Sequence, residues 1–125
     1  MIIEIDFNSE DAIYIQLCNQ IVMGIATAEL QAGESLPSVR QMASNLGVNM
    51  HTVNKAYGIL RQEGYLNLDR RRGAVIAVSA REKMLEMAEL QNRLQFVMAQ
   101  AICKGVGRED MHYIVDQLYD QMSNE

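Results

Sequence analysis

The chain has 125 residues and a formal net charge of −5, with 49% hydrophobic and 22% charged residues. This composition is that of a folded chain with one domain, or a small domain with an appendage, and excludes a disordered one. No apolar run approaches the roughly 18 residues that a bilayer span needs, which excludes an integral membrane protein. The acidic first residues do not form a signal peptide, so we expect a cytoplasmic protein.

Motifs that carry catalytic chemistry are absent from the sequence. It has no glycine-rich phosphate loop and no nucleophile elbow. Cys18 and Cys103 lie far apart among apolar residues, so we expect two buried free thiols. Together with His51 and His112 they lack the spacing of metal ligands. We therefore expect no enzyme, no cofactor and no metal site.

The first predicted helix runs from Glu10 to about Leu30. Ser9 is the expected N-cap, and an apolar stripe with i+4 spacing begins at Ile13. We expect Gly33 to end this helix as a C-terminal turn residue. The width of the stripe predicts that neighbouring elements cover much of the helix.

Two short helices are predicted next. Ser38 and Gln41 form an S-x-x-Q capping pattern, so the second helix should begin at Ser38 and close at Gly47. Asn49 is the expected N-cap of the third helix, which should end at Gly64. Two short helices joined by a tight glycine-containing turn are typical of a helix-turn-helix.

After the third helix the helical period of the apolar residues ends, and two short runs are typical of strands. Residues 65–68 and 74–78 read as two strands around a tip that contains Arg70, Arg71 and Arg72. The predicted β-hairpin follows the helix-turn-helix directly, which is the order of a winged helix. We expect a mainly α fold with a small β-hairpin: a winged helix-turn-helix domain over residues 1–78 and a helical tail over residues 79–125.

The tail should contain a long helix from about Ala80 to Lys104 and a last helix from about Glu109 to Met122. The stripe on the long helix is broader than packing against one neighbour requires, so we expect these helices to build a homodimer. The alternative is that the long helix folds back onto its own winged helix. The expected dimer residues are apolar and come from both helices: Met84, Met87, Leu90, Leu94, Val97, Met98, Ile102, Ile114 and Leu118.

Charge is unevenly distributed along the chain. Residues 35–62 contain no Asp or Glu. Residues 35–78 hold six basic and two acidic residues, a net charge of +4, so the rest of the chain carries −9 of the total of −5. A surface of the predicted winged helix can therefore attract phosphate although the whole chain is acidic. This favours DNA binding over the alternative, a winged-helix protein-interaction module that binds no DNA.

A set of residues in the predicted winged helix forms a specific combination: Ile13–Leu17, Leu30–Gly33, Leu36–Arg40, Ala43, Leu46–Asn49, Thr52, Val53, Ala56, Tyr57, Leu60, Gly64–Leu66 and Gly73. With this combination the sequence resembles the GntR family of bacterial transcription regulators over about residues 12–78. The short two-helix tail is similar to that of the YtrA-type subfamily, in which it serves dimerisation.

The resemblance implies a set of DNA contacts in this chain. Arg40 is the arginine of the family's LPSxR motif, and it either reads a base or only anchors a phosphate. The wing of the family usually carries GxG, but here Arg71 stands at the first glycine, and Met50 also departs from the residues usual at its position. The expected DNA-binding residues are polar or basic with few exceptions: Ser38, Arg40, Asn49, Met50, His51, Thr52, Asn54, Lys55, Arg70, Arg71, Arg72 and Gly73.

These expectations together describe a regulator, most simply a repressor, that binds a palindromic double-stranded DNA operator as a homodimer. Each recognition helix would enter a major groove, with half-sites about one helical turn apart. The nine methionines are either plain core or the lining of a site for a small-molecule effector. No residue of the sequence indicates the identity of such an effector.

Overall fold

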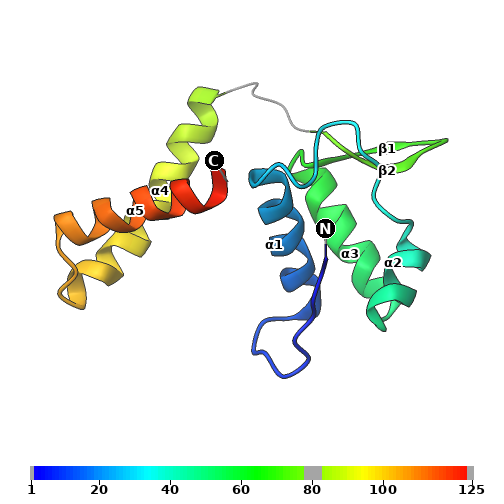
Figure 1. Ribbon diagram of the computed structural model, residues 1–125, viewed down its shortest axis with the longest axis horizontal. Coiled ribbons are helices and arrows are strands. Elements are labelled where there is room, and N and C mark those ends of the chain that lie inside the picture. The colour runs from blue at the N-terminus through cyan, green and yellow to red at the C-terminus, as the bar shows by residue number, and fades with distance from the viewer. Residues whose placement is uncertain (1, 78–82, 124–125) are drawn as a thin grey trace. The chain divides into compact units, whose positions relative to one another are not determined.

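The computed structural model describes residues 2–77 and 83–123. It divides into two compact units, Met1–Ser79 and Ala80–Glu125. The first unit holds three helices and a two-stranded hairpin, and the second holds two helices (Figure 1). The expected mainly helical winged fold is confirmed. The joint at residues 78–82, where the predicted second strand ends and the long helix begins, lies outside the described residues.

Helix α1 spans Ile13–Ala26 and is shorter than predicted at both ends. Ser9 is not its N-cap, because the Ser9 hydroxyl accepts from the Asp11 N–H in a local turn at 3.1 Å. The helix also ends before Gly33, because Ala28 takes a left-handed φ of 65° and turns the chain so that Leu30 enters the core. The burial of Leu30 therefore ends the helix earlier than the periodicity predicted.

An extended segment before α1 is held along this helix by two glutamine side chains. The Gln16 amide accepts from the Asp6 N–H at 2.9 Å and donates to the Asp6 carbonyl at 3.0 Å. The Gln20 amide makes the same pair of bonds to the backbone of Glu4. Residues four apart lie on one face of a helix, so the two amides pair with alternate residues of the segment.

Helices α2 (Val39–Leu46) and α3 (Met50–Gln62) form the predicted helix-turn-helix. Ser38 caps α2, since its Oγ accepts from the Gln41 N–H at 3.1 Å. Gly47 then takes the left-handed conformation, with φ 68°, that closes α2 and turns the chain into the next helix. Both predicted N-caps and the glycine turn between the helices are confirmed.

The wing is an antiparallel pair of short strands, β1 (Leu66–Asp69) and β2 (Gly73–Ile76). Each strand begins one residue away from the prediction. A feature that the sequence did not reveal is a bridge between Ser35 and Val75, which places the segment before α2 along β2. The Leu36 N–H donates to the Ala74 carbonyl at 2.8 Å, and the Ile76 N–H donates to the Glu34 carbonyl at 2.8 Å.

One apolar core joins all elements of the first unit. Leu17 and Ile21 of α1 are fully buried, and α3 contributes Val53 and Leu60 with at most 1% exposure. Burying such aliphatic side chains is worth roughly 1.5–3 kcal/mol each. This core is what fixes the outer faces of α2, α3 and the wing in space. Its remaining members come from every part of the unit: Leu30, Leu36, Met42, Ala43, Ala56, Tyr57, Leu66, Ala74 and Ile76.

The second unit contains α4 (Lys83–Cys103) and α5 (Arg108–Ser123), joined by a turn with a left-handed glycine at Gly105. No residue of α5 is buried. Cys103 is exposed and Cys18 only half-buried, so the expectation of two buried thiols is wrong. It failed for Cys103 because this residue ends α4, and the described residues of the second unit do not cover it. Within the described residues, no helix is long and apolar enough to cross a membrane.

Candidate nucleic-acid interface

The start of α3 presents several of the predicted DNA-binding side chains to solvent. Asn49, Met50, His51 and Asn54 are exposed, and Thr52 is half-buried. The opposite face of the helix, which includes Val53 and Ala56, is fully buried. The helix is therefore held from behind by the core while its polar face is left open.

The start of α2 lies beside the start of α3. One open depression is lined by Val39 of α2 together with the exposed residues Asn49, Met50, His51 and Asn54. Arg40 follows Val39 and is exposed. The turn between the helices thus brings the start of α2, the helix that carries Arg40, beside the polar start of α3.

Two of the predicted DNA-binding residues already cap helices. The Asn49 Oδ1 accepts from the His51 N–H at 2.7 Å, so only its amide N–H groups remain as donors. The Ser38 Oγ accepts from the Gln41 N–H, which leaves its hydroxyl proton available to an acceptor such as phosphate. Both residues have a structural role that limits which contacts they can make.

Lys55 is exposed and its ammonium lies over the ring of Tyr14, with 4.0 Å between Nζ and the ring centroid. This cation–π contact joins α3 to the first turn of α1. The sequence predicts a phosphate contact for Lys55 but no partner within the protein. No local sequence pattern predicts its contact with Tyr14, because the two residues lie 41 positions apart.

The wing tip is a compact turn closed by Asp69. Its Oδ1 accepts from the backbone N–H groups of Arg71 at 2.7 Å and of Arg72 at 3.1 Å. These backbone hydrogen bonds lower the pKa of Asp69, and the nearby Arg72 charge adds to the effect. The Arg72 guanidinium also donates to the Gly33 carbonyl. Arg70 and Arg71 are exposed at the tip.

Gly73 follows the tip with φ 75°, a left-handed conformation that glycine adopts without strain. It opposes Asp69 at the end of the hairpin. Of the two glycines of the GxG pattern, this chain therefore keeps Gly73, the one whose left-handed φ the turn requires. Arg71, which stands where the family has its other wing glycine, is not among the residues with a left-handed φ in the described part of the chain.

Tyr57 is a residue whose polar role the sequence did not indicate. Its ring is only 5% exposed and its hydroxyl donates to the Pro37 carbonyl at 2.8 Å. Burial raises the pKa of Tyr57, so the hydroxyl stays protonated and remains a donor. The signal for this role is general: a buried tyrosine needs a hydrogen-bond partner for its hydroxyl.

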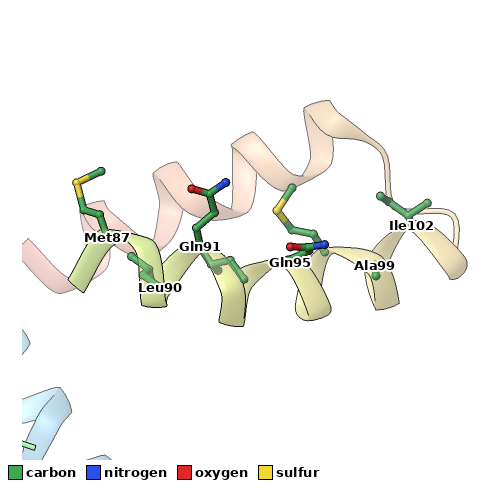
Figure 2. A pocket seen from close by; sticks show the side chains of 8 residues that line it. Met87, Leu90, Gln91, Gln95, Ala99 and Ile102 are labelled. Carbon is green, nitrogen blue, oxygen red and sulfur yellow. The ribbon is translucent and has the colours of Figure 1, made fainter. Parts of the chain in front are cut away.

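The predicted dimer residues whose side chains are described are open to solvent. Those with described side chains are between 43% and 69% exposed, and the side chain of Met84 lies outside the described residues. Figure 2 shows Met87, Leu90 and Ile102 among the residues that line a depression along α4. A second depression is lined by residues of α4 and α5 and shares Leu94, Met98 and Ile102 with the first.

Comparison with known proteins gives a consistent assignment. Residues 13–76 match the family described as "Bacterial regulatory proteins, gntR family". The chain is 31% identical over 118 residues to the HTH-type transcriptional repressor YtrA of Bacillus subtilis (strain 168), an alignment that covers 93% of this chain and 91% of the relative. That alignment reaches beyond the winged helix into the tail.

Two solved structures are similar over most of the chain. YtrA from Sulfolobus acidocaldarius, a GntR-family transcription factor, is 40% identical with a TM-score of 0.66, covering 82% of this chain and 99% of that chain. A transcriptional antiterminator from Listeria monocytogenes EGD-e is 28% identical with a TM-score of 0.85, covering 98% and 92%. The chain belongs to the GntR family and is a DNA-binding transcription regulator that resembles the YtrA type.

Proposed function

We propose that this regulator is a cytoplasmic repressor that binds a palindromic operator as a homodimer. Helix α3 of each protomer enters a major groove, and the wing contacts the adjacent backbone or minor groove. The observation that carries this proposal is that the start of α2, the helix that carries the exposed Arg40, lies beside the exposed polar residues at the start of α3. No acidic residue occurs between positions 35 and 62, so neither α2 nor α3 contributes a carboxylate to the surface around these residues, which offers donors and positive charge to DNA.

The predicted residues divide into two kinds of contact. Arg40, His51 and Asn54 are exposed donors at or beside the start of α3, suited to base edges in the groove. Ser38, Lys55 and the wing arginines suit phosphates, which position the protein without reading sequence. Four more residues complete the surface through donor groups, apolar contact or close backbone approach: Asn49, Met50, Thr52 and Gly73.

Dimerisation through the tail is supported by its uncovered apolar residues. On α4, Leu94, Met98 and Ile102 are 44%, 43% and 69% exposed. Contiguous exposed apolar side chains on a soluble protein mark an interface. A second copy of the tail is the partner that a palindromic operator requires, because a two-fold DNA site is matched by a two-fold protein.

The test of base reading uses Arg40. The operator is first selected from a pool of random duplexes with the unaltered chain, and each base pair is then varied in turn. In the Arg40→Ala variant we expect discrimination at one base position in each half-site to fall by roughly 1–3 kcal/mol, the value of a bidentate arginine–guanine contact. Fluorescence anisotropy with labelled duplexes measures the affinities.

Arg93→Ala is the matched control, because Arg93 lies on the tail and its only ion pair in the described residues is the exposed one with Glu89. It removes the same charge and should leave base discrimination unchanged. If Arg40→Ala weakens every duplex equally, Arg40 only anchors a phosphate. If no duplex is selected at all, sequence-specific operator binding is wrong.

A further inference from the structure

The segment Gly33–Ser38 is linked to the three elements that carry the proposed DNA contacts, which are the wing, α2 and α3. It runs along β2 of the wing through the Ser35–Val75 bridge, with the Gly33 N–H donating to the Ile76 carbonyl at 2.9 Å. Its last residue, Ser38, caps the helix that carries Arg40. We call Gly33–Ser38 the junction segment.

Helix α3 is joined to the junction segment by the side chain of Tyr57. The Tyr57 hydroxyl, on the buried face of α3, donates to the carbonyl of Pro37, the residue directly before the N-cap of α2. The wing makes a second side-chain link, from the Arg72 guanidinium to the Gly33 carbonyl. The junction segment is thus hydrogen-bonded to the wing along its length and to α3 at its end.

We propose that Tyr57 is a positioning residue for operator recognition: through Pro37 its hydroxyl sets the start of α2, and so the place of Arg40, relative to α3 and the wing. This inference rests on the proposed function. Tyr57 itself does not touch DNA, because its ring lies in the core. What it controls is whether Arg40 and the polar start of α3 meet the same base pairs at the same time.

The physical reason is that no other side-chain hydrogen bond in the described residues joins α3 to the junction segment. Without the hydroxyl, the Pro37 carbonyl loses its partner and must turn toward water or stay unsatisfied. A carbonyl that turns toward water moves the residue before the N-cap, and a small displacement of that residue is carried to Arg40, two positions beyond Ser38. The phosphate contacts of Lys55 and the wing tip do not depend on this bond.

The experiment compares Tyr57→Phe with the unaltered full-length chain. The probes are the duplex selected from a random pool and a scrambled duplex of the same composition. We expect the ratio of the two affinities to fall about five- to tenfold, a part of the discrimination that one bidentate arginine contact supplies. The slope of log affinity against log salt should stay unchanged, since Lys55 and the wing arginines, the charged residues proposed to contact phosphates, are unaltered.

Tyr65→Phe is the matched control, a tyrosine that is half-buried and makes no side-chain hydrogen bond in the described residues. It should leave the affinity ratio unchanged. Affinities are measured well below the melting temperature of each variant, so a loss of stability alone does not alter the ratio. An equal loss of affinity for both duplexes, or no loss, would overturn the proposal.

A second measurement separates this inference from the proposed function. Backbone amide shifts of the DNA-free protein are recorded by NMR for both variants. In Tyr57→Phe we expect shifts at Ser38, Arg40 and the wing residues Ala74–Ile76, beyond the neighbours of Tyr57 in α3. Shifts confined to α3 refute the positioning role. If the unaltered chain selects no duplex, the proposed function fails, and the amide shifts still decide the role of Tyr57.

Discussion

Several polar side chains of the first unit form hydrogen bonds to its own backbone in the DNA-free protein. Ser38 and Asn49 cap α2 and α3, and Asp69 closes the wing tip. Replacing such a cap by alanine costs about 1 kcal/mol of stability. A loss of DNA affinity in these variants therefore has to be separated from a loss of folded protein, whereas Arg40 is exposed and free of this complication.

Asp69 gives a prediction about pH. The hydrogen bonds from Arg71 and Arg72 lower the pKa of Asp69 from its ordinary value of 3.8. The stabilisation that the ionised carboxylate gives to the wing tip is therefore complete above pH 3.8. The contribution is lost as the pH falls through the lowered pKa. We expect the carboxyl of Asp69, followed by NMR, to titrate below 3.8, with the amide shifts of Arg71 and Arg72 changing in the same range.

Asp69→Asn is the control for this titration, because its amide oxygen still accepts from the two N–H groups but does not titrate. The pH dependence of the Arg71 and Arg72 amides should vanish in that variant. A midpoint for Asp69 at or above 3.8 contradicts the hydrogen-bonded tip.

At the scale of single residues, sequence reasoning found the exposed polar side chains but not their partners. The caps at Ser38 and Asn49 are local, because the bonded groups lie two or three residues apart. The contacts of Lys55 with Tyr14 and of Tyr57 with Pro37 join different elements. No pattern in the sequence encodes which elements approach one another at those points.

The wing is the element whose electrostatic role can be measured directly. Each lost phosphate contact should reduce the slope of log affinity against log salt by about 0.9. We expect the double variant Arg70→Gln, Arg71→Gln to show a shallower slope by up to about 1.8, because both side chains are exposed at the tip.

Arg93→Gln, on the tail, is the comparison for the wing variants and should keep the slope of the unaltered chain. An unchanged slope in the double wing variant would remove the wing from the DNA interface. Arg72 is left intact in this experiment because it also donates to the Gly33 carbonyl and holds the wing to the junction segment.

At the scale of elements, prediction succeeded where local signals were strong. α2 and α3 were predicted closely from their caps and from Gly47, which takes φ 68° at the turn. α1 was predicted too long because the burial of Leu30 overrode a continuous apolar pattern. The Ser35–Val75 bridge was missed, since a single residue pair leaves no periodic signal in the sequence.

At the scale of the molecule, the tail gives the prediction about assembly. Leu94 is 44% exposed on α4 and belongs to both depressions of the tail. We expect Leu94→Glu to make the protein monomeric at concentrations where the unaltered chain is dimeric, because a charge buried without a partner opposes association. Analytical ultracentrifugation measures the change, and affinity for the two-half-site operator should fall with it.

Asn92→Glu adds the same charge to α4 two residues away, about 160° around the helix axis by the 3.6-residue repeat. It should leave the dimer intact. A dimeric Leu94→Glu protein would place the subunit interface elsewhere, and a monomeric unaltered chain would remove the homodimer from the proposal.

The net charge of −5 is the sum over two parts of the chain that carry opposite charge. Residues 35–78 carry +4 and the remaining residues carry −9. We expect long-range repulsion between the acidic parts and the phosphate backbone to limit non-specific binding and to favour approach by the basic residues. An acidic isoelectric point is therefore compatible with a DNA-binding regulator, provided that the charges are segregated.

The sequence by itself determined the order of elements, the caps of α2 and α3, the basic wing and the membership of the GntR family. These features depend on periodicity, on local hydrogen bonds and on residue identity, all of which act over a few positions. Only the tertiary structure decided where α1 ends, that Cys103 is exposed, and that Tyr57 bonds to Pro37. Those outcomes depend on which distant side chains share the core, and the core forms only when the elements pack together.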